Sequence, residues 1–275
     1  MLNDFLSYAF LQNALIASVF TSIVAGIIGV IVVEKKMIMM AGGIAHASYG
    51  GVGLGYLLGF TPIIGAFIFA LISAFGVGAL KRKGGTDKDI IIGLFWSLGM
   101  SLGIIFIALM PGYPPDLSSY LFGNILAVTR EDLWLLGILT MLVIFLVFSL
   151  FNNWKAYLFD EKFASIKGGA TVFLEYLLLF LIGITVVVLI RGVGIILCLS
   201  MLIAPAAAAR LLFHKLGSRI IGAVAFGLIF TLSGLVISYL GNMPSGGVIV
   251  VMSVLSYLFL YLATSRIFKE RKNEG

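Results

Sequence analysis

The chain has 275 residues, of which 61% are hydrophobic and only 11% are charged, and its formal net charge is +6. A soluble domain carries about a quarter charged residues, because they cover its water-facing surface. The composition therefore excludes a soluble globular protein and indicates an all-α polytopic membrane protein.

Nine apolar segments are long enough for a helix that crosses the ~30 Å hydrocarbon core of a membrane, which takes ~20 residues. Helices are expected because an isolated strand cannot satisfy its backbone in lipid, and the alternation of a β-barrel is absent. A count of eight follows if one short segment only dips into the membrane. The nine segments are Tyr8–Val33, Met37–Gly59, Pro62–Leu80, Ile90–Met110, Leu133–Leu150, Val172–Ile190, Val193–Leu212, Ile220–Leu240 and Val248–Ala263.

The basic residues separate the two ends of these segments. Sixteen of the 18 Lys and Arg residues lie in or beside every second connection or after the last segment, and only Arg130 and Arg191 lie on the other side. Cytoplasmic loops carry the excess of Lys and Arg, so the pattern predicts a cytoplasmic C-terminus and an N-terminus outside. It also explains the net charge without a nucleic-acid partner.

Two connections have sequence features of their own. Pro111–Asp116 ends the fourth segment, since proline removes a backbone donor, and the following Leu117–Leu126 is short enough for a re-entrant or interfacial helix. Tyr157–Gly169 mixes aromatic and charged residues and predicts a short amphipathic helix on the cytoplasmic side. Such a helix either rests on the lipid headgroups or docks a cytoplasmic partner.

Ionisable residues within the segments are few. Glu175 is the one acid inside a span, about a turn from its cytoplasmic end, and we expect it to pair with Arg210. The lack of acids at mid-depth argues against an ion-coupled carrier. No GxxxxGK[ST] loop is present, so nucleotide hydrolysis is not expected of this chain. His46 and Ser48, two residues apart, do not share a helix face, which argues against a serine protease.

His46 lies ten residues after Lys36, or ~15 Å along a helix, near the middle of the membrane. An ionisable group at that depth is a candidate functional residue. One helix face also carries Gly42, Gly43, Gly50 and Gly53, and small residues permit either close helix packing or space for an ion. A core histidine with a hydrogen-bonded ring and a ligand-contacting histidine both fit this pattern.

The seventh segment carries three further candidates. Cys198 and Met201 are soft potential metal ligands three residues apart, although buried sulfur side chains usually only pack. Because Cys198 is the single cysteine, an internal disulfide and a CxxC motif are excluded. Pro205 is expected to kink this helix in its cytoplasmic half.

Five stretches follow one another along the chain: GIAHASYGGVGLG (43–55), TDKDIIIGLFWSLGMSLG (86–103), DLSSYLFGNIL (116–126), FDEKFASIKG (159–168) and GVGIILCLSMLIAPAAAARL (192–211). In this order and spacing the chain resembles, over nearly its full length, the ZnuB/MntB-like permeases of bacterial ABC importers for zinc and manganese. The resemblance implies one permease domain over residues 1–275 in the cell membrane, with the type II-like importer fold, and zinc or manganese as substrate rather than as a resident cofactor.

The resemblance also implies partners and site residues. A second permease protomer would form a homodimer around the translocation path, two cytoplasmic ATPase subunits would hydrolyse ATP, and an extracellular protein would deliver the metal. Residues near 158–169 would form the coupling helix, with Phe159, Asp160, Glu161, Phe163, Ala164, Ile166 and Gly168 facing the ATPase. The path would include Gly42, Gly43, Gly50, Gly53 and Pro205.

One position departs from the family pattern. Many members carry an acid four residues before the histidine, whereas this chain has Gly42. His46 alone supplies two nitrogens across a dimer, fewer than the four ligands usual for zinc. Water, Ser48, Tyr49 or the sulfurs of Cys198 and Met201 would complete a transient site, or the substrate differs. The alternatives are a permease for another small solute such as a metal chelate, and a stand-alone channel or carrier.

Overall fold

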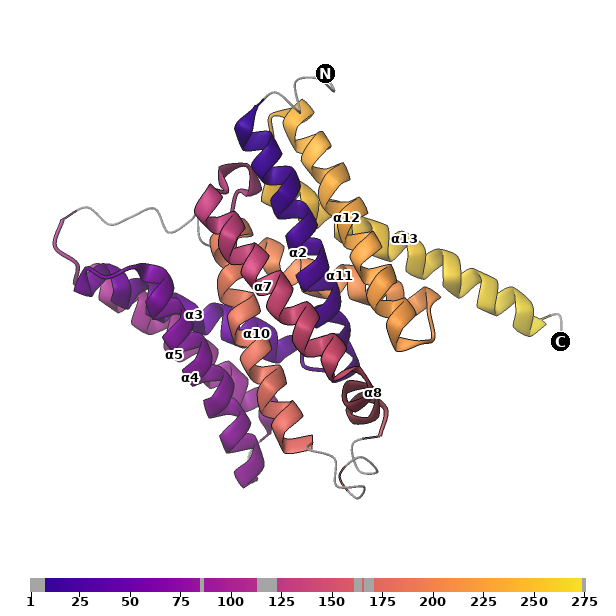
Figure 1. The fold of residues 1–275 in the computed structure, drawn as a ribbon, viewed down its shortest axis with the longest axis horizontal. Coiled ribbons are helices and arrows are strands. Elements are labelled where there is room, and N and C mark those ends of the chain that lie inside the picture. The colour runs from indigo at the N-terminus through magenta and orange to yellow at the C-terminus, as the bar shows by residue number, and fades with distance from the viewer. Residues whose placement is uncertain (1–7, 85–86, 113–122, 161–164, 166–170, 274–275) are drawn as a thin grey trace.

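The computed structural model describes residues 8–84, 87–112, 123–160, 165 and 171–273. This part of the chain consists of α-helices, one short 3-10 helix and their connections, which confirms the all-α expectation (Figure 1). The elements are α2 (Ala9–Glu34), α3 (Ile38–Leu58), α4 (Pro62–Lys83), α5 (Lys88–Ala108), η1 (Ile125–Ala127), α7 (Arg130–Ser149), α8 (Phe151–Phe159), α10 (Thr171–Val193), α11 (Ile195–Leu212), α12 (Leu216–Gly241) and α13 (Ser245–Asn273).

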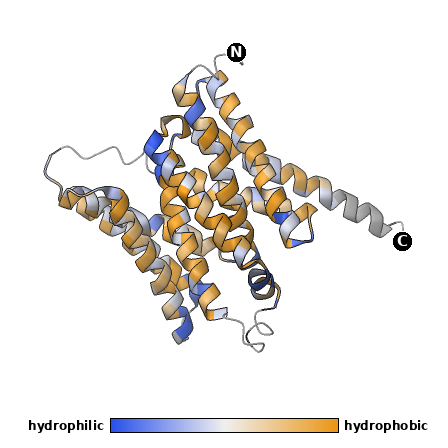
Figure 2. Ribbon diagram, viewed as in Figure 1, coloured by the Kyte–Doolittle hydropathy of each residue, from blue (hydrophilic) through white to orange (hydrophobic). Residues whose placement is uncertain are grey.

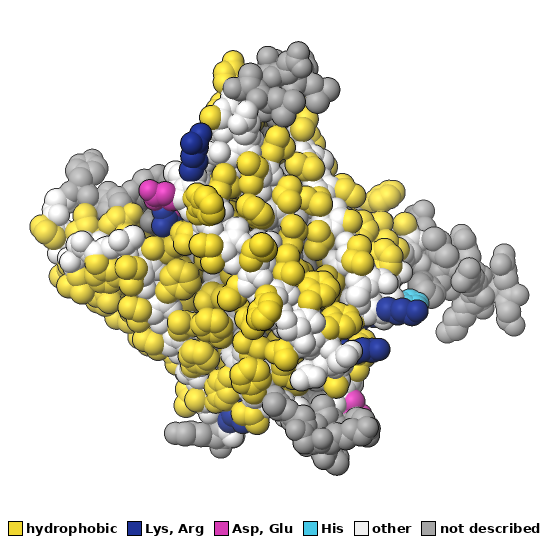
Figure 3. Space-filling view, viewed as in Figure 1, with side chains coloured by type: hydrophobic (Ala, Val, Ile, Leu, Met, Phe, Trp, Pro, Cys, Tyr) yellow, Lys and Arg dark blue, Asp and Glu magenta, His cyan; other side chains and the backbone are white. Residues whose placement is uncertain are grey.

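Within the described ranges, eight helices are both long and apolar enough to cross a membrane: α2, α4, α5, α7, α10, α11, α12 and α13. The second expected segment forms α3, which has 21 residues but is not among the eight, because glycines and His46 dilute its apolar residues. In the part of the chain that the structure describes, nine helices therefore have the length of a span, and eight also have the composition. Figure 2 shows apolar residues along the helices, and Figure 3 shows charged side chains at the edges of an apolar face.

The bundle is centred on α2 and α10. In their membrane-spanning stretches 78% and 72% of the residues are buried, compared with 28% in α5 and 17% in α13. Helix α2 packs against α7, α11 and α12, and α3 packs between α4 and α5. Figure 1 shows α3, α4 and α5 together on one side of α10, with α12 and α13 on the other. The least buried helices are thus at the two flanks.

Glycines permit the closest of these crossings. A Cβ atom added to Gly51 of α3 would lie 1.9 Å from the carbonyl oxygen of Gly65 in α4. On the other side of α3, a Cβ atom on Gly99 of α5 would lie 2.4 Å from the Cα atom of Ala47. Lipid supplies no hydrophobic drive for helix association, so close backbone packing of this kind has to stabilise the bundle.

Ion pairs at the two ends of the bundle correct one expectation. Glu175 pairs with Lys81 at 2.8 Å and Arg82 at 2.7 Å, whereas the expected partner Arg210 lies 3.8 Å from Glu34. The reason is the packing of α10 along α4, which brings the start of α10 to the basic end of α4. Arg210, at the end of α11, instead faces the end of α2.

The arrangement of these pairs agrees with the expected charge separation. Arg191, at the end of α10, pairs with Asp132 and Glu131 in the first turn of α7, where Arg130 also lies. Asn13 of α2 donates a hydrogen bond to the carbonyl of Val128, just before α7. Arg130 and Arg191, the two basic residues of the side with few charges of this sign, therefore lie near the start of α2. Glu34 and its arginines lie at the other end of α2. Which end faces the cytoplasm stays a prediction from the loop charges.

The expected amphipathic helix is described only at its start and at residue 165. Phe159 is the last residue of α8 and Asp160 follows it, but Glu161, Phe163, Ala164, Ile166 and Gly168 lie outside the described residues. Likewise, most of the expected re-entrant segment lies outside them, and its end contains η1. The coupling helix therefore stays a sequence-based expectation.

Candidate functional site

His46 lies near the middle of α3 and faces α5. Its imidazole stacks on the Trp96 ring with 4.2 Å between centroids and 5° between planes. Nδ1 is buried and has no hydrogen-bond partner in the described part of the chain. A buried polar atom without a partner costs about 1–3 kcal/mol, so such an atom calls for a water molecule or an ion. The ring is thus held in place by stacking while one nitrogen is left available.

Gly42 leaves open space one turn before His46. A Cβ atom on Gly42 would have no heavy atom within 4 Å, although the residue itself is buried. Residues four apart share a helix face, so this space lies beside the imidazole. The structure therefore has room for an additional ligand, water or a longer side chain where the expected acid is missing.

The other three glycines of this face make close contacts within the chain. A Cβ atom would lie 2.5 Å from the Ile92 side chain at Gly43, 2.7 Å from the Gly99 carbonyl oxygen at Gly50, and 2.6 Å from the Gly103 carbonyl oxygen at Gly53. All three contacts are with α5. These glycines bring α3 and α5 together and so set the position of Trp96 over His46.

Ser48 and Tyr49 have other surroundings. The Ser48 hydroxyl donates to the carbonyl of Ala45 at 2.6 Å, and its side chain lines a cavity of about 250 Å³ between α3, α4 and α10. Tyr49 is buried, and its ring lies against Gly103 of α5. The Ser48 cavity is also lined by Arg191, at the end of the bundle that has few basic residues. Ser48 therefore faces away from the contact between His46 and Trp96.

The candidate residues of α11 are buried in the core of the helical bundle. Cys198 and Met201 are fully buried, and the Met201 methyl group lies between α11 and Gly227 of α12, next to Ser22 of α2. Pro205 is buried inside α11, which continues through it to Leu212. The structure thus gives Met201 a packing environment apart from His46. Among the described residues, no three His, Cys, Asp or Glu side chains form a group that could hold a metal.

Sequence reasoning missed Trp96. It lies in a stretch chosen for its family resemblance, and nothing in the pattern of α5 distinguishes it from the neighbouring apolar residues. Its role depends on the crossing of α3 and α5, which the glycine contacts set. The partners of Glu175 were missed for the same kind of reason, because they lie on a helix that is distant in sequence.

Comparison with known proteins assigns this helical bundle to a family. A model of the ABC 3 transport family matches residues 7–264. The chain belongs to this family. It is 40% identical to an uncharacterized membrane protein, slr2045, of Synechocystis sp., with 92% of this chain and 90% of the relative covered. It is 37% identical to the manganese transport system membrane protein MntC of Listeria monocytogenes, with 95% and 93% covered.

A solved structure agrees with the family assignment. The chain matches one from "PsaBC from Streptococcus pneumoniae in complex with Fab" with a TM-score of 0.85 and 34% identity, and 94% of each chain is covered. Membership of the ABC 3 transport family confirms the resemblance to ABC importer permeases and the location in the cell membrane.

Proposed function

We propose that this ABC 3 family member is the permease of an importer that moves a divalent metal ion, manganese or zinc, into the cell. The manganese system named for its Listeria relative supports the substrate class. The structural observation that carries the proposal is the unpartnered Nδ1 of His46, near mid-helix, beside the open space at Gly42. This nitrogen is the group that would contact the metal during its passage.

A site with so few protein ligands fits transit rather than storage. Imidazole suits zinc, while water and carbonyl oxygens suit manganese, so one imidazole with ordered water can serve either ion weakly. Cys198 and Met201 do not take part in this mechanism, because sulfur packed in the helix core would have to be exposed first. Weak coordination lets the ion leave towards the cytoplasm.

The family assignment and the exposed surfaces support three kinds of partner. A second copy of the permease would complete the path, and the weak burial of α5, which carries Trp96, supports a partner near His46. Separate ATPase subunits would hydrolyse ATP, and an extracellular metal-binding protein would deliver the ion. Phe159 is 58% exposed at the end of α8, which fits the start of an ATPase-docking segment.

The test is transport by the permease assembled with its ATPase in vesicles, with Mn²⁺ and Zn²⁺ as probes. His46→Leu roughly keeps side-chain volume, so we expect a folded complex with uptake and metal-stimulated ATP hydrolysis reduced at least tenfold, the loss expected for one polar contact worth ~1.4 kcal/mol. The matched control is His214→Leu, since His214 is the other histidine of the chain and is exposed outside the spans. Wild-type uptake by folded His46→Leu would refute the assignment.

A further inference from the structure

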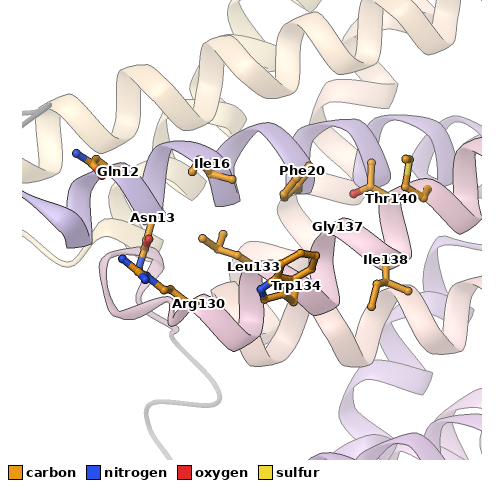
Figure 4. A pocket seen from close by; sticks show the side chains of 11 residues that line it. Gln12, Asn13, Ile16, Phe20, Arg130, Leu133, Trp134, Gly137, Ile138 and Thr140 are labelled. Carbon is orange, nitrogen blue, oxygen red and sulfur yellow. The ribbon is translucent and has the colours of Figure 1, made fainter.

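A second feature of the molecule is a groove between α2 and α7, with a volume of about 770 Å³. Its walls include Ile16 and Phe20 from α2 and Leu133, Trp134 and Ile138 from α7 (Figure 4). Trp134 and Ile138 are 76% and 64% exposed, so the groove opens on the outside of the bundle, where lipid surrounds the protein. It is distinct from the His46 region, which lies between α3 and α5.

One end of the groove is polar and carries a positive charge. Figure 4 shows Gln12, Asn13 and Arg130 grouped at this end, apart from the aromatic and aliphatic side chains. Arg130 is exposed and makes no hydrogen bond or ion pair with any residue in the described ranges. The two acids that follow it, Glu131 and Asp132, are both directed to Arg191. The guanidinium is therefore available to an external anion.

The length of the groove matches one leaflet. From Arg130 to Met141, which also lines it, α7 rises eleven residues or ~16 Å, about half of the ~30 Å hydrocarbon thickness. A ligand that fits has an anionic group at the membrane surface and a single apolar chain of this length below it. A guanidinium fork also matches the geometry of a phosphate group.

We propose that this groove binds an anionic phospholipid, with the phosphate on Arg130 and one acyl chain between α2 and α7. The lipid would come from the leaflet on the side of the protein that has few basic residues. The charges of the loops predict that this is the outer leaflet. Charge complementarity favours a lipid with net negative charge over a zwitterionic one, because Arg130 has no carboxylate of the described chain to neutralise it. The proposal is independent of the transported substrate.

The test uses the full-length permease in nanodiscs of equal parts phosphatidylglycerol and phosphatidylcholine, followed by native mass spectrometry of the lipids retained in detergent. The wild type should retain phosphatidylglycerol preferentially. Arg130→Gln should weaken its retention roughly tenfold by removing a charge-assisted hydrogen bond, with phosphatidylcholine unchanged. Arg130 is exposed, so this variant should fold normally.

A second variant fills the apolar part. A Cβ atom on Gly137 would lie 3.7 Å from the Phe20 ring, an ordinary contact, so Gly137→Leu can extend into the groove without a backbone clash. It should remove the retained lipid, whereas Ile221→Phe, which adds bulk at a 72% exposed position of α12 that does not line the groove, should not. Unchanged phosphatidylglycerol retention in Arg130→Gln, or equal retention of both lipids by the wild type, would overturn the proposal. So would loss of dimers in Gly137→Leu with lipid retention intact, since the occupant would then be a second protomer.

Discussion

The crossing of α3 and α4 provides the sharpest stability test, through Gly51→Ala. The added Cβ atom would lie 1.9 Å from the Gly65 carbonyl oxygen and 2.7 Å from the Ala66 nitrogen, both backbone atoms. Ordinary contacts begin near 3.4 Å, so the two helices would have to separate by about 1.5 Å over this turn. Overpacking typically costs 1–3 kcal/mol, and two rigid backbones place this case near ~3 kcal/mol.

The matched control on the same helix is Gly42→Ala. Its Cβ atom would meet no heavy atom within 4 Å, so no clash opposes the higher helix propensity of alanine. Alanine is favoured over glycine in a helix by at most ~1 kcal/mol. The gain in stability is smaller than this, because protein unfolded in detergent retains part of its helix and the preference then acts in both states. The same chemical change in one helix should therefore destabilise at Gly51 and be neutral or slightly stabilising at Gly42.

The single cysteine provides the assay. Cys198 is fully buried, so a thiol-reactive dye reports its exposure as the purified protein unfolds on heating. Gly51→Ala should lower the midpoint of the labelling transition by several degrees relative to the wild type, and Gly42→Ala should not lower it. Equal midpoints for the two variants would refute the packing argument for α3 and α4.

Three further predictions concern the site and the ion pairs. Gly42→Asp should tighten Mn²⁺ binding by the isolated permease by about tenfold, because it places a carboxylate in open space one turn from His46. Calorimetry measures this affinity, and an unchanged value would count against a metal path at this position. Glu175→Gln should lower the free energy of unfolding by about 1 kcal/mol in the labelling assay, since Glu175 is buried but its partners are half exposed. Arg210→Gln should cost less, and the reverse order would contradict the observed pairing. Phe163→Asp should leave the permease in the membrane but abolish ATPase association in a pull-down, and normal association would rule out the expected coupling helix.

The helices and their approximate ends could be predicted from sequence because lipid imposes a local requirement. Every backbone polar group in the hydrocarbon has to be paired within the same segment, and a span needs a minimum apolar length. The nine expected segments accordingly correspond to the long helices of the described chain, which are α2, α3, α4, α5, α7, α10, α11, α12 and α13. The exception is informative, since α3 has the length of a span but carries the glycines and His46 that reduce its apolar character. Composition thus distinguishes α3 from the other long helices.

The contacts between helices could not be predicted in the same way. These helices are apolar on nearly all faces, so hydrophobic periodicity does not indicate which face meets protein and which meets lipid. Glu175 was therefore expected to pair with Arg210, although the packing of α10 on α4 gives it Lys81 and Arg82. The pairing of His46 with Trp96 is likewise a consequence of where α3 crosses α5.

By itself, the sequence determined the membrane class, the helical segments, the segregation of basic residues and, through its motifs, the resemblance to a permease family. Each of these depends on residues near one another in the chain or on composition. Only the tertiary structure decided that Gly43, Gly50 and Gly53 pack against α5 while Gly42 borders open space. The difference is physical, because a glycine's role depends on which backbone lies opposite it, and that is set by the rotation and crossing of whole helices.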